Sequence, residues 1–375
     1  MKKIKAAIIG CGVISEVYLD SIRENFQILD IVACSDLDEV RMNSTAQKYG
    51  IRAAAYEEIL KEPEIEMVIN LTSPAVHYPL TKQALEHGKH VYSEKMIAVE
   101  LEQAKELCQI AEKNKVRLGC APDTFLGGGI QTAKYALEKG MIGIPHSGLI
   151  SLSRDYRVYG ENLPHLFRHG GSVLYDMGCY YLTAFASLLG PVKSVMSFGK
   201  KTEEIHKIKR ISSRFYGQEI PLDDCNVITA ILAYGNGTLV TLHMNSSSVV
   251  DETFHLELYG DRGILRLGDP NTFGGRVSIQ KPHNEPLAVP LSHGFQEQSR
   301  GLGAAEMAWS ICSDRPHRAS KEMACHVLEI VHGIFCSIET QTVYQMTTTF
   351  RKPEILPEGY IGKGFWEPEE ETALL

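Results

Sequence analysis

The sequence lacks the patterns that mark several large classes of protein. No stretch of its 375 residues approaches the roughly 20 consecutive apolar residues that a membrane span needs. No run of Lys or Arg is long enough to follow a phosphate backbone, and 38 basic against 46 acidic side chains leave a net charge of −8. We therefore expect neither a membrane span nor a nucleic-acid partner.

The cysteines also follow no pattern. Nine of them are scattered along the chain without a CxxC pair. The apolar run at 6–9, after the basic start at residues 1–4, is too short for the core of a signal peptide. Both features favour reduced thiols in the cytoplasm over disulfide bonds, and we expect no metal site.

What the sequence does contain is typical of a two-domain globular protein. Apolar residues make up 44% and charged residues 22%, and the length exceeds one ordinary core. Up to residue 121 short apolar runs alternate with helical segments, which predicts an α/β domain with a doubly wound parallel sheet over residues 1–121. Residues 122–375 are predicted to form a second, α+β domain with a large open, mostly antiparallel sheet.

A glycine turn follows the first predicted strand, at 4–9, and leads into a helix that ends near Asn25. Such a turn lets the backbone approach a pyrophosphate, while free N–H groups and the helix dipole face its charge. Ser15 stands where a third glycine is usual, and a purely structural turn is the alternative reading. The residues expected to contact a dinucleotide here are Gly10, Gly12, Val13 and Ile14.

The next predicted strand ends in an acid. Asp36 follows Gly12 by 24 residues (36 − 12), the spacing expected for a carboxylate that binds the adenosine ribose. Its neighbours Leu37 and Asp38 include no Arg that would accept a 2′-phosphate, so we favour NAD over NADP. An Asp that only caps a helix is the alternative.

Two further strand ends reach the same predicted crevice, because the carboxyl ends of parallel strands share one edge of a sheet. The strand at 67–71 runs into the turn 72–77, and the strand at 90–93 delivers Glu94 and Lys95. Thr72 and Ser73 are candidates to line the cofactor, although as helix N-caps they would need no further purpose.

The second half is predicted to be rich in antiparallel strands. Hairpin turns are expected at 235–237 and 260–263. If one face of the sheet is left uncovered, we expect it to be the interface of a homodimer or homotetramer. Before these strands, a helix from Asp176 to Leu189 would place Asp176 and Tyr180 on one face. The polar, aromatic segment 154–171 either frames a substrate or is a solvated connection. The predicted strands are 147–153, 192–198, 227–234, 238–245, 253–259 and 263–267, and a helix is predicted at 297–312.

Taken in order, these motifs resemble the glucose-fructose oxidoreductase, inositol dehydrogenase and rhizopine-catabolism family, Gfo/Idh/MocA. The resemblance implies an NAD(P)-binding Rossmann domain, a polyol, sugar or cyclitol substrate, and Lys95 as the catalytic lysine beside Glu94. The segment 121–129 resembles one subgroup of the family. The matching motifs are Gly10-Cys11-Gly12, Thr72-Ser73-Pro74 with His77, Glu94-Lys95, and Gly170-Gly171 with Asp176-Met177-Gly178. The residues expected to contact substrate are Asp123, Thr124 and Tyr156, and those expected to hold the cofactor include Thr72, Ser73, Pro74, His77, Glu94 and Lys95.

Two positions depart from the family pattern. Met96 replaces the proline that usually follows the Glu-Lys pair, and Tyr180 replaces the usual histidine four residues after the acid. We therefore expect Tyr180 to carry the proton, acidified by a nearby Lys95. The pKa of Lys95 itself is expected to be lowered by desolvation near a cationic nicotinamide, while Asp176 holds Lys95 and orients a substrate hydroxyl.

Three functions remain open on the sequence. The first is an NAD-dependent dehydrogenase of a sugar, cyclitol or glycoside. The second is a glycosidase that uses NAD for a transient oxidation followed by elimination, and the third is a regulator that binds NAD without catalysis. Net formation of NADH separates the first from the other two.

Overall fold

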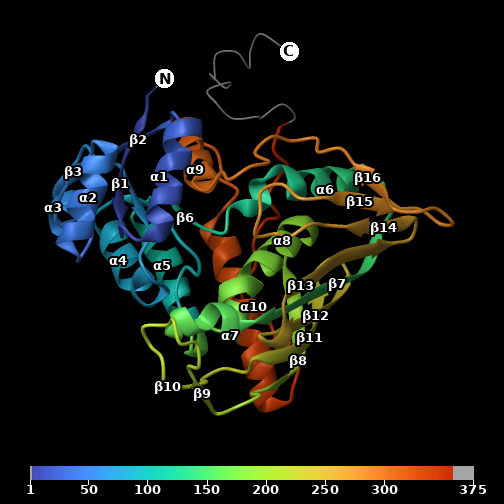
Figure 1. Ribbon diagram of the computed structural model, residues 1–375. Helices are drawn as coiled ribbons and strands as arrows, with labels where there is room; N and C mark the ends of the chain where they lie inside the picture. Colours follow the sequence, from blue (N-terminus) through green and yellow to red (C-terminus); the bar gives the residue numbers. More distant parts are fainter. Residues whose placement is uncertain (1, 358–375) are drawn as a thin grey trace, which may run out of the picture.

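The computed structural model describes residues 2–357 and has a first domain with a six-stranded parallel sheet (Figure 1). The strand order is β3-β2-β1-β4-β5-β6, so the direction in which the sheet is wound reverses at β1. The whole of β4 is buried, as expected for a parallel strand with helices on both faces. The elements are β1 Ile4–Ile9, α1 Val13–Asn25, β2 Leu29–Ser35, α2 Glu39–Tyr49, β3 Arg52–Ala53, α3 Tyr56–Lys61, β4 Met67–Asn70, α4 Pro74–Glu86, β5 His90–Ser93, α5 Leu101–Lys113 and β6 Leu118–Cys120.

The second domain is built on a nine-stranded sheet with the order β16-β15-β14-β13-β7-β12-β11-β8-β17. Its strand pairs are antiparallel except β12 with β7, so the predicted mostly antiparallel sheet is confirmed. The strands are β7 Pro145–Asp155, β8 Val192–Lys200, β11 Val227–Tyr234, β12 Leu239–Asn245, β13 Ser247–Gly260, β14 Gly263–Arg266, β15 Val277–Gln280, β16 Leu287–Val289 and β17 Tyr344–Gln345.

One face of this sheet is covered and the other is open. Buried and more exposed residues alternate along β11, and α10 packs on β8 (Figure 1).

Both predicted hairpins are present, between β11 and β12 and between β13 and β14. The helices of this half are η1 Thr124–Leu126, α6 Gly128–Glu138, α7 Tyr156–Tyr159, η2 Gly160–Asn162, η3 Pro164–Phe167, the π-helix η4 Leu174–Gly178, α8 Cys179–Leu189, α9 Leu302–Cys312 and α10 Lys321–Thr340.

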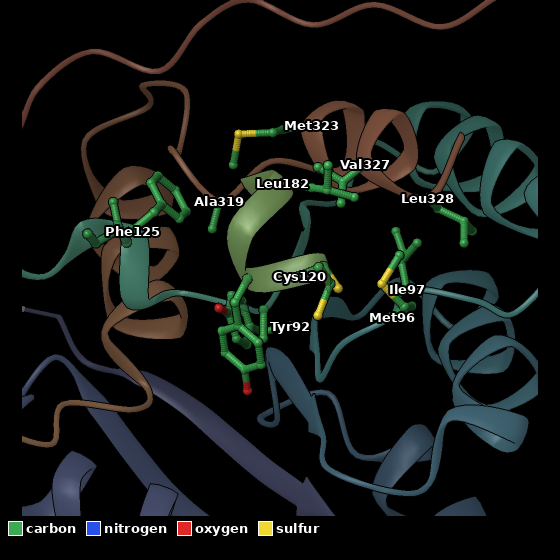
Figure 2. Close-up of a cluster of buried hydrophobic side chains, with 14 of the residues drawn as sticks. Tyr92, Met96, Ile97, Cys120, Phe125, Leu182, Ala319, Met323, Val327 and Leu328 are labelled. Atoms are coloured by element: carbon green, nitrogen blue, oxygen red, sulfur yellow. The ribbon is translucent and has the colours of Figure 1, made fainter. Parts of the chain in front are cut away.

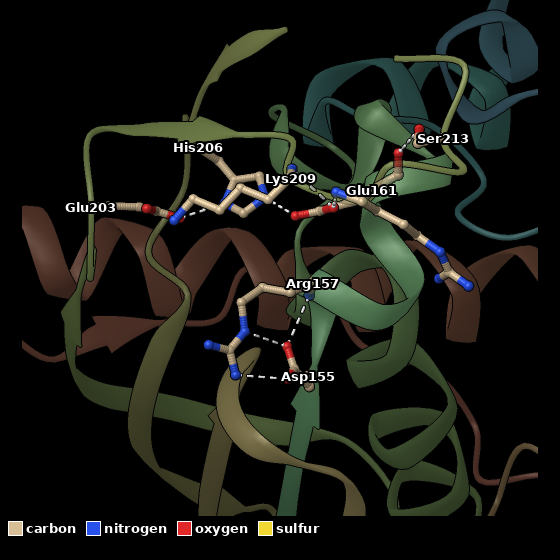
Figure 3. A network of polar contacts seen from close by, with 8 residues as sticks. Asp155, Arg157, Glu161, Glu203, His206, Lys209 and Ser213 are labelled. Carbon is tan, nitrogen blue, oxygen red and sulfur yellow. Dashed lines mark hydrogen bonds and ion pairs between the residues drawn. The ribbon is translucent and has the colours of Figure 1, made fainter. Parts of the chain in front are cut away.

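A two-stranded ribbon, β9 Ile205–Lys207 with β10 Glu219–Pro221, stands apart from the large sheet. The buried carboxylate of Glu161 holds it, because Oε2 accepts a hydrogen bond from Lys209 N at 3.1 Å and Oε1 lies 3.2 Å from His206 Nε2 (Figure 3). The spacing of apolar residues along the sequence does not predict this ribbon, because the side chain that holds it in place, Glu161, comes from another segment.

The two domains are joined by more than the chain between them. Helix α10 contacts α5 and β6 of the first domain as well as α8 and β8 of the second. By length and composition alone α10 could cross a membrane. It packs as a core helix, however, because 61% of its most apolar 18-residue stretch is buried inside the protein. Helix α9 begins at Leu302, five residues later than predicted (302 − 297), because Gly301 adopts a left-handed φ of 100° at its N-cap.

Candidate active site

The glycine turn has the geometry that a dinucleotide needs. Gly10 has a φ of 93°, and a Cβ there would lie 2.9 Å from the Leu71 carbonyl, so glycine alone fits between the ends of β1 and β4. Around Gly12, by contrast, a Cβ would meet nothing within 4 Å. Ser15 is buried, and its hydroxyl donates to the Gly12 carbonyl at 2.6 Å. A pyrophosphate therefore has open space against the first turn of α1.

Asp36 is fixed at the end of β2 by main-chain donors. Its Oδ2 accepts from Cys11 N at 2.7 Å and its Oδ1 from Asp38 N at 2.8 Å, and 11% of the side chain is exposed. Arg41, from the first turn of α2, brings Nη1 to 3.8 Å from Asp36 Oδ2 and also pairs with Asp38 at 3.3 Å. Sequence reasoning considered only the immediate neighbours and missed this arginine, whose charge is shared between two carboxylates.

The turn after β4 is locked from the interior by His77. The side chain is fully buried, with Nδ1 2.7 Å from Met96 O and Nε2 2.8 Å from Thr72 O. His77 was predicted to hold the cofactor, but the structure gives its ring no exposed surface, so it positions the two loops that line the crevice. Ser73, in contrast, is exposed at the N-cap of α4, has no side-chain capping bond, and precedes Pro74.

Glu94 and Lys95 lie at the end of β5, as predicted. Glu94 Oε1 accepts from the Tyr18 hydroxyl at 2.7 Å, and Oε2 accepts from Lys95 N at 3.0 Å. The peptide bond between Lys95 and Met96 is cis. Met96 is buried in a cluster with Ile97 (Figure 2). The residue that departs from the family pattern is thus held by apolar packing.

Lys95 reaches across to the second domain. Its Nζ donates to Asp176 O at 2.8 Å and to Asp176 Oδ1 at 2.9 Å, and it lies 5.1 Å from the centroid of the Tyr180 ring. The hydroxyl of Tyr156 donates to Asp176 Oδ2 at 3.0 Å. Asp176 belongs to the π-helix η4, a widened turn of the kind found at functional sites. Four of the predicted residues, Lys95, Asp176, Tyr180 and Tyr156, therefore meet at one place.

The ion pair sets the charges at this site. Burial, the largest single influence, acts to lower the pKa of Lys95, but Asp176 together with Tyr180 and Cys179 outweighs it, and the pKa is raised well above its usual value. Burial likewise acts to raise the pKa of Asp176, but Lys95 together with Tyr156 and Arg154 outweighs it, so that pKa is lowered. The lowered pKa was expected for Lys95 beside a cationic nicotinamide and stays a prediction; in the chain without cofactor the pKa is raised.

Tyr180 is under opposing influences. Burial raises its pKa, whereas the positive charges of Lys95 and Arg300 act to lower it, and burial prevails. Lys95 does act to lower the pKa of Tyr180, as expected, but its effect is smaller than that of burial. Arg300, from the loop before α9, was not predicted, since it follows no recognisable motif.

Two residues predicted to contact substrate do not line the site. Asp123 is buried, and its Oδ2 accepts hydrogen bonds from Gly301 N and Gly303 N, both at 3.0 Å. It therefore caps the start of α9. Thr124, in η1, is also buried. Their contact with a substrate stays a prediction, and the structure gives Asp123 a structural role at the start of α9.

Among residues 2–357 no three side chains of His, Cys, Asp or Glu are grouped as a metal site would require. Whether the chain can bind a dinucleotide cofactor is judged from the residues of the first domain that would contact it. Open space over Gly12, an exposed Ser73 and the held carboxylate of Asp36 lie along one edge of the sheet, at the ends of β1, β2 and β4. These residues fit a dinucleotide.

Comparison with known proteins agrees with this geometry. Residues 4–121 match the GFO_IDH_MocA oxidoreductase family with an NAD-binding Rossmann fold, and residues 130–266 match the GFO/IDH/MocA C-terminal domain. The chain is 26% identical to D-apiose dehydrogenase of Paraburkholderia graminis over 276 residues, 71% of this chain and 68% of that protein. It is 23% identical to myo-inositol 2-dehydrogenase of Thermotoga maritima over 268 residues, 69% and 74% of the two chains.

Solved structures share the fold. Levoglucosan dehydrogenase in complex with NADH and levoglucosan superposes with a TM-score of 0.78. The match covers 92% of this chain and 100% of that chain at 16% sequence identity. At this identity the likeness concerns the fold alone.

Proposed function

The chain belongs to the Gfo/Idh/MocA family of NAD(P)-dependent oxidoreductases, and we propose that it transfers a hydride between NAD and a secondary alcohol of a sugar, cyclitol or glycoside. The observation that carries the proposal is the contact of Lys95 Nζ with Asp176 Oδ1 at 2.9 Å. This contact lies at the carboxyl end of β5, the edge where Rossmann domains bind nicotinamide.

NAD, when bound, supplies the acceptor for the hydride. The first turn of α1 and the open space over Gly12 would hold its pyrophosphate, and Asp36 would accept hydrogen bonds from the adenosine ribose. Because Arg41 is shared with Asp38, the region stays acidic on balance, which favours NAD over a cofactor that carries a 2′-phosphate.

The protonation states divide the chemical roles. Lys95 has a raised pKa beside Asp176, so it acts as an ammonium that donates a hydrogen bond to the substrate oxygen. Tyr180, beneath the same ammonium, would accept the hydroxyl proton as a phenolate, the form that the charge of Lys95 favours against the opposing effect of burial. Asp176 keeps Lys95 directed at the crevice and is itself held by Tyr156.

The substrate class is proposed from the site and from relatives. Paired donors and acceptors at Lys95, Asp176 and Tyr156 suit a ligand with several neighbouring hydroxyl groups. The names of the similar proteins, D-apiose, myo-inositol and levoglucosan dehydrogenases, all describe such ligands.

The proposal is tested by following absorbance of NADH while the purified chain is incubated with NAD and a panel of sugars, cyclitols and simple glycosides. Net NADH with at least one of them is expected. Cleavage of a glycoside without net NADH would establish the glycosidase instead. Binding of NAD without turnover of any compound would favour a regulator.

A further inference from the structure

His169 lies between two carboxylates that belong to different domains. Its Nδ1 is 2.9 Å from Oδ1 of Asp224, in the loop between β10 and β11, and its Nε2 is 3.3 Å from Oε1 of Glu100, at the N-cap of α5. An imidazole ring can donate a hydrogen bond from both nitrogens only when it is protonated. Two acceptors on the two sides of one ring therefore favour the imidazolium, and we call this arrangement the His169 bridge.

Asp224 depends on the bridge for a partner. Its side chain is 9% exposed, and within residues 2–357 its other oxygen, Oδ2, is buried without a hydrogen bond. A buried carboxylate is costly unless a donor or a positive charge compensates it. The pKa of His169 is raised above its usual value, chiefly by its hydrogen bond with Asp224, while burial acts against the rise and Glu100 adds to it.

Three further titratable groups lie beside His169. Asp223 Oδ2 accepts from the backbone N–H of His169 at 3.1 Å and from Arg168 Nε at 2.7 Å, so its charge is already paired. The ring of Tyr175 lies edge-on to the imidazole, with 5.5 Å between the centroids. The carboxylates that face the imidazole nitrogens are thus those of Asp224 and Glu100.

The bridge holds the loop that carries Lys95. This loop follows β5 and ends at Glu100, one of the two carboxylates of the bridge. Next to the bridge, a Cβ on Gly170 would lie 2.9 Å from Val99 Cγ1, so the backbone after the histidine packs closely on the same loop. The carbonyl of Val99 also accepts from His332 Nε2 of α10 at 2.9 Å. The end of the loop is therefore held by the second domain.

The bridge also lies against the segment that carries Asp176. Tyr175, whose ring packs on His169, immediately precedes Asp176 in the π-helix η4. Lys95 Nζ donates to Asp176 Oδ1 at 2.9 Å. This ion pair therefore joins the same two segments that His169 contacts.

We propose that His169 is a positioning residue whose imidazolium, by bridging Glu100 and Asp224, keeps the loop of Lys95 against Asp176. When the ring loses its proton, one of the two contacts loses its donor and the loop is held less firmly. The purpose of the bridge rests on the proposed dehydrogenase chemistry, whereas the bridge itself requires no substrate.

The first test measures the ring directly, so it is independent of any activity. The chain is labelled with ¹³C-histidine, and the Cε1–H signal of His169 in the NMR spectrum is assigned by its absence in His169→Gln. The titration midpoint in the parent should lie above the ordinary value of about 6.5. Glu100→Gln should lower this midpoint, and Asp224→Asn should lower it further, because Asp224 is the closer and the more buried carboxylate.

The control is Glu102→Gln in the first turn of the same helix, where the carboxylate is 83% exposed and pairs with Lys105. It should leave the midpoint unchanged. A parent midpoint at or below about 6.5 overturns the proposal, and so does a midpoint that the loss of either carboxylate leaves in place. If Asp224→Asn does not fold, Glu100→Gln decides alone, since the side chain of Glu100 is exposed.

The second test measures how firmly the loop of Lys95 is held. Amide hydrogen exchange of residues 96–100 is compared between the parent and His169→Gln at equal pH, about one pH unit below the midpoint and again about one unit or more above it. Below the midpoint these amides should exchange about threefold faster or more in the variant, because the charged bridge is absent. Above the midpoint the difference should shrink. An equal difference at both pH values would make the role of His169 purely structural and overturn the proposal.

Turnover of a substrate found in the screen connects the bridge with the reaction. The ratio of kcat/KM between the parent and His169→Gln should be highest below the midpoint and fall as the pH rises through it. A ratio that does not change with pH would overturn the positioning role. A raised midpoint and pH-dependent exchange without turnover of any compound would instead refute the dehydrogenase and keep the His169 bridge.

Discussion

At the scale of single residues, an ion pair between side chains 81 positions apart decides the charge of the site. Lys95 and Asp176 each lose solvation on burial, and each other's charge together with the neighbouring groups more than offsets this loss, so both stay ionised. On this basis we propose a division of roles in which the lysine donates a hydrogen bond and the tyrosine accepts the proton.

Replacement of Lys95 tests this division. Lys95→Met should lower turnover by roughly 10²- to 10⁴-fold, because the donor to the substrate oxygen is lost. NAD affinity, measured by quenching of tryptophan fluorescence or by calorimetry, should be nearly unchanged, since the pyrophosphate and ribose contacts lie on other strands. Lys105→Met is the matched control, because this half-buried lysine on α5 pairs with Glu102, away from Asp176 and Tyr180. Full activity of Lys95→Met would remove this residue from the mechanism.

We propose that Asp36 determines the choice between NAD and NADP. Asp36→Ala should weaken NAD about tenfold or more, the effect of losing a charged hydrogen-bond acceptor, and should affect NADP much less. Dissociation constants for both cofactors, compared with those of Glu39→Ala on the exposed first turn of α2, provide the measurement. Equal losses for the two cofactors would contradict the ribose assignment.

At the scale of elements, the sequence predicted which helices and strands are present better than the residues at which they begin and end. The strand of β11 and both hairpins follow from alternation and from Gly-containing turns, and they are confirmed. The start of α9 was placed too early because its N-cap is the left-handed Gly301, whose N–H is held by the carboxylate of Asp123, distant in sequence. The π-helix around Asp176 was likewise not predicted, since its register depends on packing rather than on period.

Helix α6 offers a prediction about stability and pH. Lys134 is 1% exposed, its Nζ donates to Ser187 O at 2.7 Å and to the Pro353 carbonyl, and burial lowers its pKa to about 7. The unfolded chain, with an ordinary lysine, binds more protons than the folded chain from about pH 7 up to about pH 10, so stability rises with pH across this window.

The experiment compares the parent with Lys134→Met by urea denaturation. Between about pH 7 and about pH 9 the parent should gain about 2 kcal/mol relative to the variant. Lys139→Met, at the exposed end of the same helix, should show no such change. If the free energies of unfolding of the parent and Lys134→Met differ by the same amount at all pH values, Lys134 stays charged in the folded chain.

At the scale of the whole molecule, we propose that the open face of the large sheet joins copies of the chain. Phe198 on β8, Ile231 on β11 and Leu239 on β12 are 60%, 52% and 53% exposed. Cross-strand pairing of Thr229 with Phe198, and of Ala233 with Leu239, puts these side chains on one face. Clustered exposed apolar side chains of this kind mark interaction surfaces.

Ile231→Lys should therefore reduce the molar mass measured by light scattering after gel filtration, because a charge would be buried in the interface. Ile211→Lys, at a side chain 84% exposed near the β9–β10 ribbon, should leave the molar mass unchanged. A monomeric parent would refute the assembly, and a parent oligomer that Ile231→Lys does not weaken would place the interface elsewhere.

The sequence by itself determined the Rossmann domain, the crevice at its strand ends and the presence there of Lys95, because local spacing and apolar period dictate strand, turn and helix. Only the tertiary structure decided the charge on Lys95, the inward turn of Asp123 and the approach of Arg41 to Asp36. Most of these partners lie far apart along the chain. Electrostatic energies depend on distance and burial in space, which spacing along a sequence does not reveal.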